Sequence, residues 1–272
     1  MDLYRSPIKW VGGKNKLLKH IIPKIINLMK FSNIYVEPFV GGGSVIIELL
    51  KQCLINQIYN IKFYCFDSNP ILISMFNEIK HNPNHLIEKL KQFEFMKNEK
   101  DYYRIRQEYN QNPSVEMFMY LNKTGFRGLY SVNQKNEFNV SYGFYKDPVI
   151  YDEENILALS NLFNIFDVNF LVSDYTNMLS WFPQCIMYLD PPYFDTFGKY
   201  SKNKFCYQTY INFLKCLKQN DRILLIHSNS FQFTDVYFSN EIVEKVMLYD
   251  RINSKNPGKI RIELIFSDKR CI

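Results

Sequence analysis

The sequence contains a single alanine, Ala158, among 272 residues. Alanine has the highest intrinsic helix propensity, so helices in this chain must be recognised from the periodicity of their apolar residues. Long apolar runs are lacking as well, because lysines and a proline interrupt the richest stretch, between Leu17 and Phe31. A membrane span needs about 18 uncharged apolar residues. The first residues also lack the apolar core of a signal peptide. We therefore expect a soluble intracellular protein, in the cytoplasm or nucleoid, or in a viral factory if the source is a virus.

Cysteine pairs of the kind that bind metals are also lacking. None of the six cysteines stands in a Cys-x-x-Cys pair, and no histidine lies at ligand spacing. This pattern excludes a dense disulfide framework and the common zinc sites, and we expect no metal. Charge of one sign is not dominant, since 33 basic against 27 acidic residues leave a net charge of +6. That excess favours a polyanionic partner but does not identify one.

Bulky apolar residues are abundant, with 47% of the sequence hydrophobic and 17% aromatic. That is enough for a substantial core in one or two domains. From Ile34 onward, short apolar runs alternate with longer amphipathic stretches, which is typical of a parallel sheet with crossover helices. Strands are predicted at Ile34–Glu37, Lys62–Asp67, Asn169–Val172, Cys185–Asp190, Arg222–Ser228, Ile242–Tyr249 and Lys259–Ser267. Helices are predicted at Lys14–Lys30, Ser44–Gln57, Pro70–Lys80, Asn155–Phe163 and Tyr207–Lys218.

The alternation stops between about Ile71 and Asn155, where polar and charged residues and tyrosine are frequent. Two helices and then a turn-rich stretch, Lys123–Gly143, are predicted there. We interpret this segment as an inserted second domain. The predicted division is residues 1–70 and 156–272 for one domain and 71–155 for the insert. Only Asp250–Gly258 separates the last two strands, which predicts an antiparallel hairpin.

Three consecutive glycines, Gly41 to Gly43, follow the first predicted strand and precede a helix. Glycine lets the backbone bend sharply and lets a ligand approach where a Cβ would clash. Asp67 ends the next strand, at about the position where an acidic residue accepts hydrogen bonds from ribose hydroxyls. Ile46 replaces the third glycine of the dinucleotide fingerprint, which disfavours NAD. A nucleoside-type ligand is predicted, and a plain strand-to-helix turn is the alternative.

A second glycine turn lies in Lys9-Trp10-Val11-Gly12-Gly13-Lys14, between a large aromatic residue and a base. This composition suits stacking and the binding of a carboxylate, but it lacks the spacing of a P-loop. The alternative is a surface turn whose tryptophan packs on the core.

The most specific motif is Asp190-Pro191-Pro192-Tyr193, directly after an apolar strand. Two prolines stiffen the chain and lack N–H groups, which leaves the Asp190 carboxylate and the Pro191 carbonyl as paired acceptors. Such a site receives a planar amino group, whose nitrogen lone pair it directs at an electrophile while Tyr193 stacks on the ring. A chance Pro-Pro at a strand end is the alternative, and the glycine loop argues against it.

These motifs, in this order, resemble those of the Dam-type DNA adenine N6-methyltransferases. The similarity extends through Tyr120–Tyr130, Glu137–Val140 and Ile262–Ile265, and so spans most of the chain. It implies S-adenosylmethionine as cofactor, with S-adenosylhomocysteine as product, and a Rossmann-like seven-stranded α/β sheet with an inserted, mainly helical domain that binds double-stranded DNA. It further implies an adenine-specific DNA methyltransferase that acts on N6 of a flipped-out base.

The resemblance also implies residue roles. Trp10 and Lys14 are expected at the methionine part of the cofactor, Asp67 at its ribose and Asp174 at its adenine. The implied cofactor-binding residues are Trp10, Lys14, Glu37, Phe39, Gly41, Gly43, Asp67, Asp174 and Asp190. The implied catalytic residues are Asp190, Pro191, Pro192 and Tyr193. The implied DNA-binding residues are Lys9, Asn122, Lys123, Phe126, Arg127, Ser131 and Asn133, with Phe126 inserting between bases and Arg127 bonding a base edge or phosphate.

Two positions depart from the family pattern. Ser131 replaces the arginine of the common motif Gly-Leu-x-Arg, and Ser141 replaces the proline of the common motif Phe-Asn-Val-Pro. A hydroxyl cannot make the bidentate contact of arginine to guanine, which contributes roughly 1 to 3 kcal/mol of discrimination. The resemblance implies GATC as the recognition sequence, but the protein lacks the arginine expected to contact its guanine. Methylation of adenine does not depend on that contact.

Other functions fit parts of the sequence. An amino methyltransferase acting on RNA, on cytosine N4 or on protein glutamine would share this site, although such enzymes more often begin the tetrapeptide with Asn or Ser than with Asp. A DNA-binding homologue without catalysis conflicts with the complete tetrapeptide, and an NAD-dependent oxidoreductase conflicts with the missing glycine. A monomer is favoured, and the biological role is open among restriction-modification, repair and a viral cycle.

Overall fold

The computed structural model describes residues 3–192, 205–220, 222–230, 242–249, 260–268 and 270. Tyr193, one of the predicted catalytic residues, lies outside these described residues.

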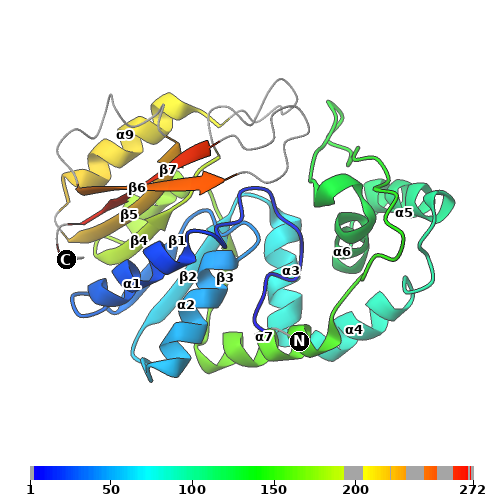
Figure 1. Cartoon of the computed structure of the whole chain (residues 1–272), viewed down its shortest axis with the longest axis horizontal. Coiled ribbons are helices and arrows are strands. Elements are labelled where there is room, and N and C mark those ends of the chain that lie inside the picture. Colours follow the sequence, from blue (N-terminus) through cyan, green and yellow to red (C-terminus); the bar gives the residue numbers. More distant parts are fainter. Residues whose placement is uncertain are drawn as a thin grey trace.

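The strands of the described chain form one twisted sheet (Figure 1). Their bounds are Ile34–Glu37 for β1, Lys62–Asp67 for β2, Asn169–Val172 for β3, Cys185–Leu189 for β4, Ile223–Ser230 for β5, Ile242–Tyr249 for β6 and Ile260–Ser267 for β7. The order is β3-β2-β1-β4-β5-β7-β6, in which β1 to β5 pair in parallel. β7 is antiparallel to both β5 and β6. This mostly parallel sheet with an antiparallel C-terminal pair confirms the predicted α/β fold class.

Helices cover both faces of the sheet (Figure 1). Their bounds are Leu18–Leu28 for α1, Ser44–Ile55 for α2, Pro70–His81 for α3, Glu153–Ile165 for α7, Met178–Trp181 for α8 and Tyr207–Lys218 for α9. Buried residues of α1, α2, α3 and α7 pack on one face, where Tyr35 points, while α8 and α9 pack on the other, where Val36 points. No helix in the described ranges combines the length and apolar character needed to cross a membrane.

The first helix begins later than predicted, at Leu18 and not at Lys14. Residues 11–17 form turns in which the Lys14 N–H donates to Ser44 Oγ at 3.2 Å. This bond turns the segment toward the start of α2, so the helical periodicity of the sequence extends beyond the helix itself.

Between α3 and the turn-rich stretch, the insert contains three helices where two were predicted. They are α4 (Pro83–Lys91), α5 (Glu99–Gln111) and α6 (Val115–Thr124), followed by the short 3-10 helix η1 (Phe126–Gly128). Asn98 and Ser114 cap α5 and α6 by accepting backbone N–H bonds, which is the usual role of these residue types. In Figure 1 the three helices lie beside α3, away from the sheet. Since α3 packs against β2 and β3 as well as α4 and α6, the boundary between residues 70 and 71 stays a prediction.

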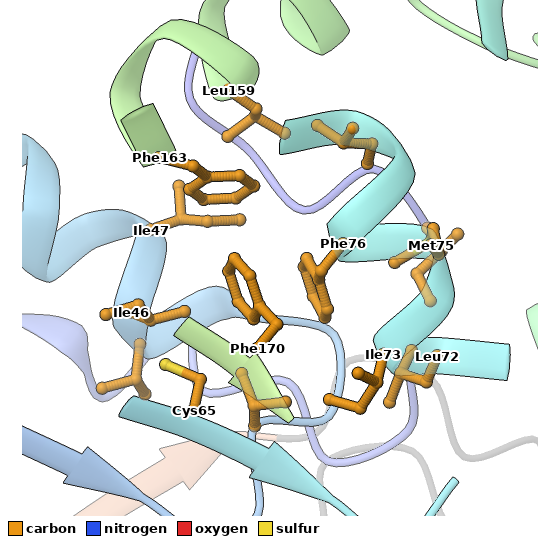
Figure 2. Close-up of a cluster of buried hydrophobic side chains, with 14 of the residues drawn as sticks. Ile46, Ile47, Cys65, Leu72, Ile73, Met75, Phe76, Leu159, Phe163 and Phe170 are labelled. Atoms are coloured by element: carbon orange, nitrogen blue, oxygen red, sulfur yellow. The ribbon is translucent and has the colours of Figure 1, made fainter. Parts of the chain in front are cut away.

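Aromatic residues fill the space between α2, α3, α7 and β3 (Figure 2). Phe76 stacks on Phe170 with ring centroids 4.7 Å apart, and Phe163 meets Phe170 edge to face at 5.0 Å. The same cluster of buried residues continues into the insert, for example to Phe118. The insert and the sheet therefore share one apolar core.

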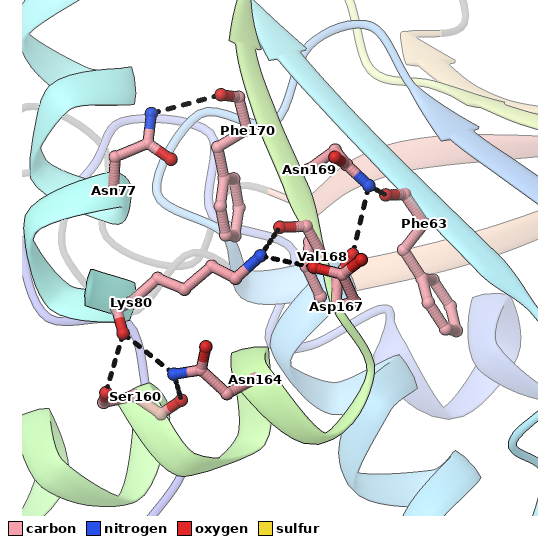
Figure 3. Close-up of polar contacts among 9 residues, drawn as sticks. All are labelled: Phe63, Asn77, Lys80, Ser160, Asn164, Asp167, Val168, Asn169 and Phe170. Atoms are coloured by element: carbon pink, nitrogen blue, oxygen red, sulfur yellow. Dashed lines mark hydrogen bonds and ion pairs between the residues drawn. The ribbon is translucent and has the colours of Figure 1, made fainter.

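A buried lysine fixes the end of α3 (Figure 3). The Lys80 ammonium donates to Asp167 Oδ1 at 2.8 Å and to the Val168 carbonyl at 2.9 Å. Its own carbonyl accepts bonds from Ser160 Oγ at 3.0 Å and Asn164 Nδ2 at 2.8 Å. These bonds tie α3 to α7 and to the start of β3.

Candidate active site

Three carboxylates lie at the carboxyl edge of adjacent parallel strands. Glu37 ends β1, Asp67 ends β2, and Asp190 directly follows β4. β1 lies between the other two strands, so the topology brings these side chains to one edge. In open α/β sheets this edge is where ligands bind.

The glycine loop adopts backbone conformations that favour glycine. Gly41 has φ 50° and Gly43 has φ 76°. A Cβ at Gly41 would lie 3.0 Å from Trp10 Cδ1, and one at Gly42 would lie 2.7 Å from Trp10 Cβ. These two glycines therefore make room for the indole. Trp10 packs on this loop, and its ring centroid lies 6.4 Å from that of Phe118 and 5.8 Å from that of Tyr130. It therefore links the loop to the insert.

Asp67 holds the glycine loop in place. Its Oδ2 accepts the Gly41 N–H at 3.1 Å, and its Oδ1 accepts the Asn69 N–H at 2.9 Å. Burial raises the pKa of Asp67, against the lowering effect of these backbone groups. A carboxylate offers about four acceptor positions, so Asp67 retains the capacity to accept hydroxyl donors.

Asp174 and Phe39 flank this edge. Asp174 follows β3, is exposed, and accepts bonds from the Thr176 N–H at 2.9 Å and from Thr176 Oγ1 at 2.6 Å. Phe39 is half-buried, with its ring centroid 5.3 Å from that of Tyr175 and 6.1 Å from that of Tyr210. Phe39 thus belongs to an aromatic cluster just before the glycine loop, and Asp174 lies beyond the carboxyl end of β3.

Glu37 is a buried acid beneath the site. It is 2% exposed, and Tyr35 OH donates to its Oε2 at 2.9 Å. Burial raises the pKa of Glu37 well above its ordinary value; the nearby Asp190 carboxylate adds to the rise, while the bond from Tyr35 opposes it. The protonated form is therefore favoured relative to an exposed glutamate.

Lys14 and Asp190, which are far apart in the sequence, form an ion pair. Lys14 Nζ lies 2.7 Å from Asp190 Oδ1 and 2.9 Å from the Gly12 carbonyl oxygen, and the lysine is only 5% exposed. The N-terminal glycine turn and the Asp-Pro-Pro turn are thereby brought together. Lys14 was expected to hold the cofactor, and the observed ion pair gives it a direct contact with the expected catalytic carboxylate.

Pro191 is buried and Pro192 is half-buried behind Asp190. Tyr207 OH, from the first residue of α9, donates to the Pro192 carbonyl at 2.7 Å. Sequence reasoning missed this contact, because an aromatic residue at a helix start carries no signal of a partner 15 residues away. Together with the ion pair, it holds the Asp-Pro-Pro turn from both sides.

Asn122 is placed differently from its prediction as a DNA contact. It is 1% exposed, and its Oδ1 accepts the Lys9 N–H at 2.8 Å. Its Nδ2 donates to the Lys9 carbonyl at 2.7 Å and to the Gly128 carbonyl at 3.0 Å. A fully bonded, buried amide has no donor left for DNA, so Asn122 positions the segments that carry Lys9 and Gly128.

Four other residues predicted to bind DNA gather around the end of α6. Lys9 is exposed, with its ammonium 3.9 Å above the Tyr145 ring and 3.5 Å from the Lys123 carbonyl oxygen. Phe126 is 47% exposed, and the exposed Arg127 guanidinium lies 5.2 Å from its ring centroid. The structure thus brings cations and an aromatic ring together on one surface.

Ser131 and Asn133 lie in the turn that follows. Ser131 is half-buried, and its carbonyl accepts the Asn139 N–H at 3.1 Å. Asn133 Oδ1 accepts the backbone N–H groups of Lys135 and Glu137 at 2.9 and 3.0 Å, and its Nδ2 donates to Glu137 Oε2 at 2.8 Å. Asn133 therefore shapes this turn. In the part of the chain that the structure describes, no group of three or more His, Cys, Asp or Glu side chains is placed to hold a metal.

The chain is similar to known DNA methyltransferases over most of its length. A family model described as "D12 class N6 adenine-specific DNA methyltransferase" matches residues 10–254. The type II methyltransferase M.MjaIII of Methanocaldococcus jannaschii is 32% identical over 274 aligned positions, covering 91% of this chain and 92% of that protein. The type II methyltransferase M1.LlaDCHI of Lactococcus lactis subsp. cremoris is 32% identical, covering 82% and 80%. The DNA adenine methylase of Haemophilus influenzae is 30% identical, covering 94% and 90%.

Proposed function

The chain belongs to the D12 class of N6 adenine-specific DNA methyltransferases, and from this premise we propose that it methylates adenine N6 in double-stranded DNA with S-adenosylmethionine as donor. The observation that carries the proposal is the ion pair between Lys14 and Asp190, at the sheet edge that also bears the glycine loop. A carboxylate held next to a glycine loop at this edge supports the proposal that Asp190 accepts an amino group beside a bound nucleoside.

The residues present fit such a cofactor. Asp67 has acceptor capacity for ribose hydroxyls, Gly41 and Gly43 allow close approach, and Phe39 offers an apolar side. Asp174 would meet the adenine of the cofactor from the end of β3. When bound, S-adenosylmethionine supplies an electrophilic methyl carbon on a sulfonium.

Asp190 accepts a hydrogen bond from the target amino group and so directs the nitrogen lone pair. The Lys14 ammonium on Oδ1 fixes the carboxylate in one orientation, which is a requirement for productive geometry. Asp190 acts as an orienting acceptor and not as a strong base, because an aryl amine loses its proton readily only once methylated. Tyr193 completes the motif and is proposed to stack on the base.

The target adenine has to leave the helix to reach this edge. Flipping a base costs a few kcal/mol, and stacking on an aromatic side chain contributes roughly 1 to 3 kcal/mol per base. The exposed cations Lys9 and Arg127, with Lys123, are proposed to hold the DNA backbone while Phe126 contacts the bases. The recognition sequence implied by resemblance is GATC, and Ser131 removes its expected guanine contact.

The test is incubation of the purified protein with methyl-labelled S-adenosylmethionine and, separately, duplex DNA, RNA and protein. Label on DNA adenine alone is expected. Label on RNA, cytosine or glutamine, or cofactor binding without transfer to any substrate, would contradict the proposal. Sequencing of methylated adenines in DNA from expressing cells then reads the recognition sequence directly. Two of the similar proteins are named type II methyltransferases, which favours a role in restriction-modification.

A further inference from the structure

Two exposed phenylalanines lie on two neighbouring segments of the insert. Phe126 is 47% exposed and Phe144 is 72% exposed. The Phe126 N–H donates to the Ser141 carbonyl at 2.8 Å, and the Gly143 N–H donates to the Thr124 carbonyl at 2.8 Å. The two segments that carry the rings are therefore fixed side by side by backbone hydrogen bonds.

Phe144 adopts a backbone conformation that aromatic residues rarely take. Its φ is 53°, in the left-handed region where a large side chain is strained. The preceding glycine is held tightly, since a Cβ at Gly143 would lie 2.8 Å from the Thr124 carbonyl oxygen. On the other side the Phe144 ring meets Tyr142 edge to face at 5.0 Å, and Tyr142 OH bonds the Lys97 carbonyl at 2.6 Å. Phe144 thus combines a strained backbone with a ring that is exposed to solvent.

Such strain and the exposure of an apolar ring both lower the stability of the folded protein, and neither improves its packing when no partner is bound. Strained residues of this kind gather at ligand-binding sites, where the bound partner uses the group that they display. For Phe144, the partner can be identified from the charges around it.

Cations contact the aromatic residues next to Phe144 in the chain and on the hydrogen-bonded segment. Tyr145 follows it in the chain and carries the Lys9 ammonium 3.9 Å above its ring. Lys123 and Arg127 flank the neighbouring Phe126 in sequence, and the Arg127 guanidinium lies over that ring. Rings interleaved with cations are the combination that stacks on bases while neutralising phosphates.

We propose that Phe144 is a second aromatic DNA contact, which stacks on bases exposed when the duplex opens and acts beside Phe126. The proposal rests on the proposed function, because it takes duplex DNA as the partner. It predicts a contact that is apolar in nature and hence separable from the phosphate contacts of the neighbouring cations.

The first test is DNA binding by Phe144→Ala, measured at several salt concentrations. Loss of one stacked base weakens binding by about 5- to 150-fold. The slope of log K against log salt stays at its wild-type value, because no phosphate contact is lost. Lys9→Ala is the contrasting variant, which reduces that slope by about one. A Phe144→Ala variant with wild-type affinity, or with a reduced slope, would overturn the proposal.

The second test places 2-aminopurine at successive positions around the target adenine. In the wild type, stacking on Phe144 makes its fluorescence at one position lower than with Phe144→Ala. Phe31→Ala, which removes a ring that is 51% exposed just before β1, at the opposite edge of the sheet, serves as the matched control and should match the wild type in both assays. Equal fluorescence in the wild type and Phe144→Ala at every position would exclude stacking.

A stability measurement checks the strain argument independently. Phe144→Gly relieves the left-handed conformation, so its Tm should exceed the wild-type value while DNA binding falls as in Phe144→Ala. A lower Tm for Phe144→Gly would show that the displayed ring serves folding and would refute the proposal. Failure of the wild type to bind any duplex DNA is a different result, which would refute the proposed function itself.

Discussion

Several side chains that the sequence predicted as ligand contacts hold other parts of the protein in place. Asp67 accepts the N–H of Gly41 in the glycine loop, Asn122 binds both peptide groups of Lys9, and Lys14 binds Asp190. Polar residues predicted as ligand contacts therefore also fix the distances between motifs. Mutating one of them changes the shape of the site along with its chemistry, so each experiment needs a stability readout beside the activity.

Lys123 predicts a pH dependence of DNA binding. Burial, together with the nearby cations Lys9 and Arg5, lowers the pKa of Lys123 to about 8 against the opposing effect of Asp152. The Lys123 ammonium, which is proposed to hold the DNA backbone, is therefore present below pH 8 and lost as the pH rises above it. DNA affinity should fall between pH 7 and 9, by no more than about tenfold per pH unit, the limit for one proton.

The control is Lys123→Arg, whose guanidinium stays charged over this range. Fluorescence anisotropy with a labelled duplex should show a flat pH profile for this variant. The same decline in both proteins would assign the titration to another group.

Asn122 provides a test of its positioning role. Asn122→Ala removes three hydrogen bonds in a buried site, which should lower the free energy of unfolding by about 2 to 4 kcal/mol. Asn56→Ala, at an exposed asparagine with a bond to the Gln52 carbonyl, should change it by less than about 0.5 kcal/mol. Urea denaturation measures both. If Asn122→Ala kept the wild-type stability and lost only DNA affinity, the result would support the prediction that Asn122 contacts DNA.

At the scale of single elements, the sequence predicted most strands and helices because their apolar periodicity reflects burial. α9 has the predicted bounds, and every predicted strand is present within one or two residues. The start of α1 was wrong, because the bond from Lys14 to Ser44 is a tertiary contact. The sequence also could not predict that β7 lies between β5 and β6. The short connection from β6 to β7 predicts that these two strands pair, but not which strand lies on the other side of β7.

At the candidate site, too, the sequence predicted local motifs but not the tertiary contacts between them. The glycine loop, Asp67 and Asp190 were found because their residue types and spacing are unusual. The Lys14 and Asp190 contact, the bond from Tyr207 to Pro192 and the burial of Asn122 depend on how distant segments pack, which one sequence does not display.

Lys80 tests how one helix is held to the sheet. Lys80→Met keeps the length of the side chain but leaves the buried Val168 carbonyl without its donor, which costs about 1 to 3 kcal/mol in the free energy of unfolding. Lys91→Ala breaks an exposed ion pair of 3.7 Å with Glu153 and should cost less than about 1 kcal/mol. Thermal unfolding of the two variants compares them; equal losses would mean that burial of Lys80 contributes nothing.

At the scale of the whole molecule, the insert and the catalytic sheet share a core. Phe76 on α3 and Phe118 on α6 belong to one cluster of buried residues, and Trp10 connects that cluster to the glycine loop. A continuous apolar core predicts cooperative unfolding. Calorimetry should show one transition whose van't Hoff and calorimetric enthalpies agree. Two separate transitions would show that the insert folds as an independent domain.

The central claim is that the Asp190 carboxylate, held by Lys14, orients an adenine amino group for methylation. The most direct measurement is mass spectrometry of nucleosides from duplex DNA after incubation with S-adenosylmethionine and either the wild type or Asp190→Ala. N6-methyladenine should form with the wild type and fall by at least about 100-fold with Asp190→Ala, while calorimetry still detects cofactor binding. Formation of N6-methyladenine at the wild-type rate by Asp190→Ala would contradict the claim.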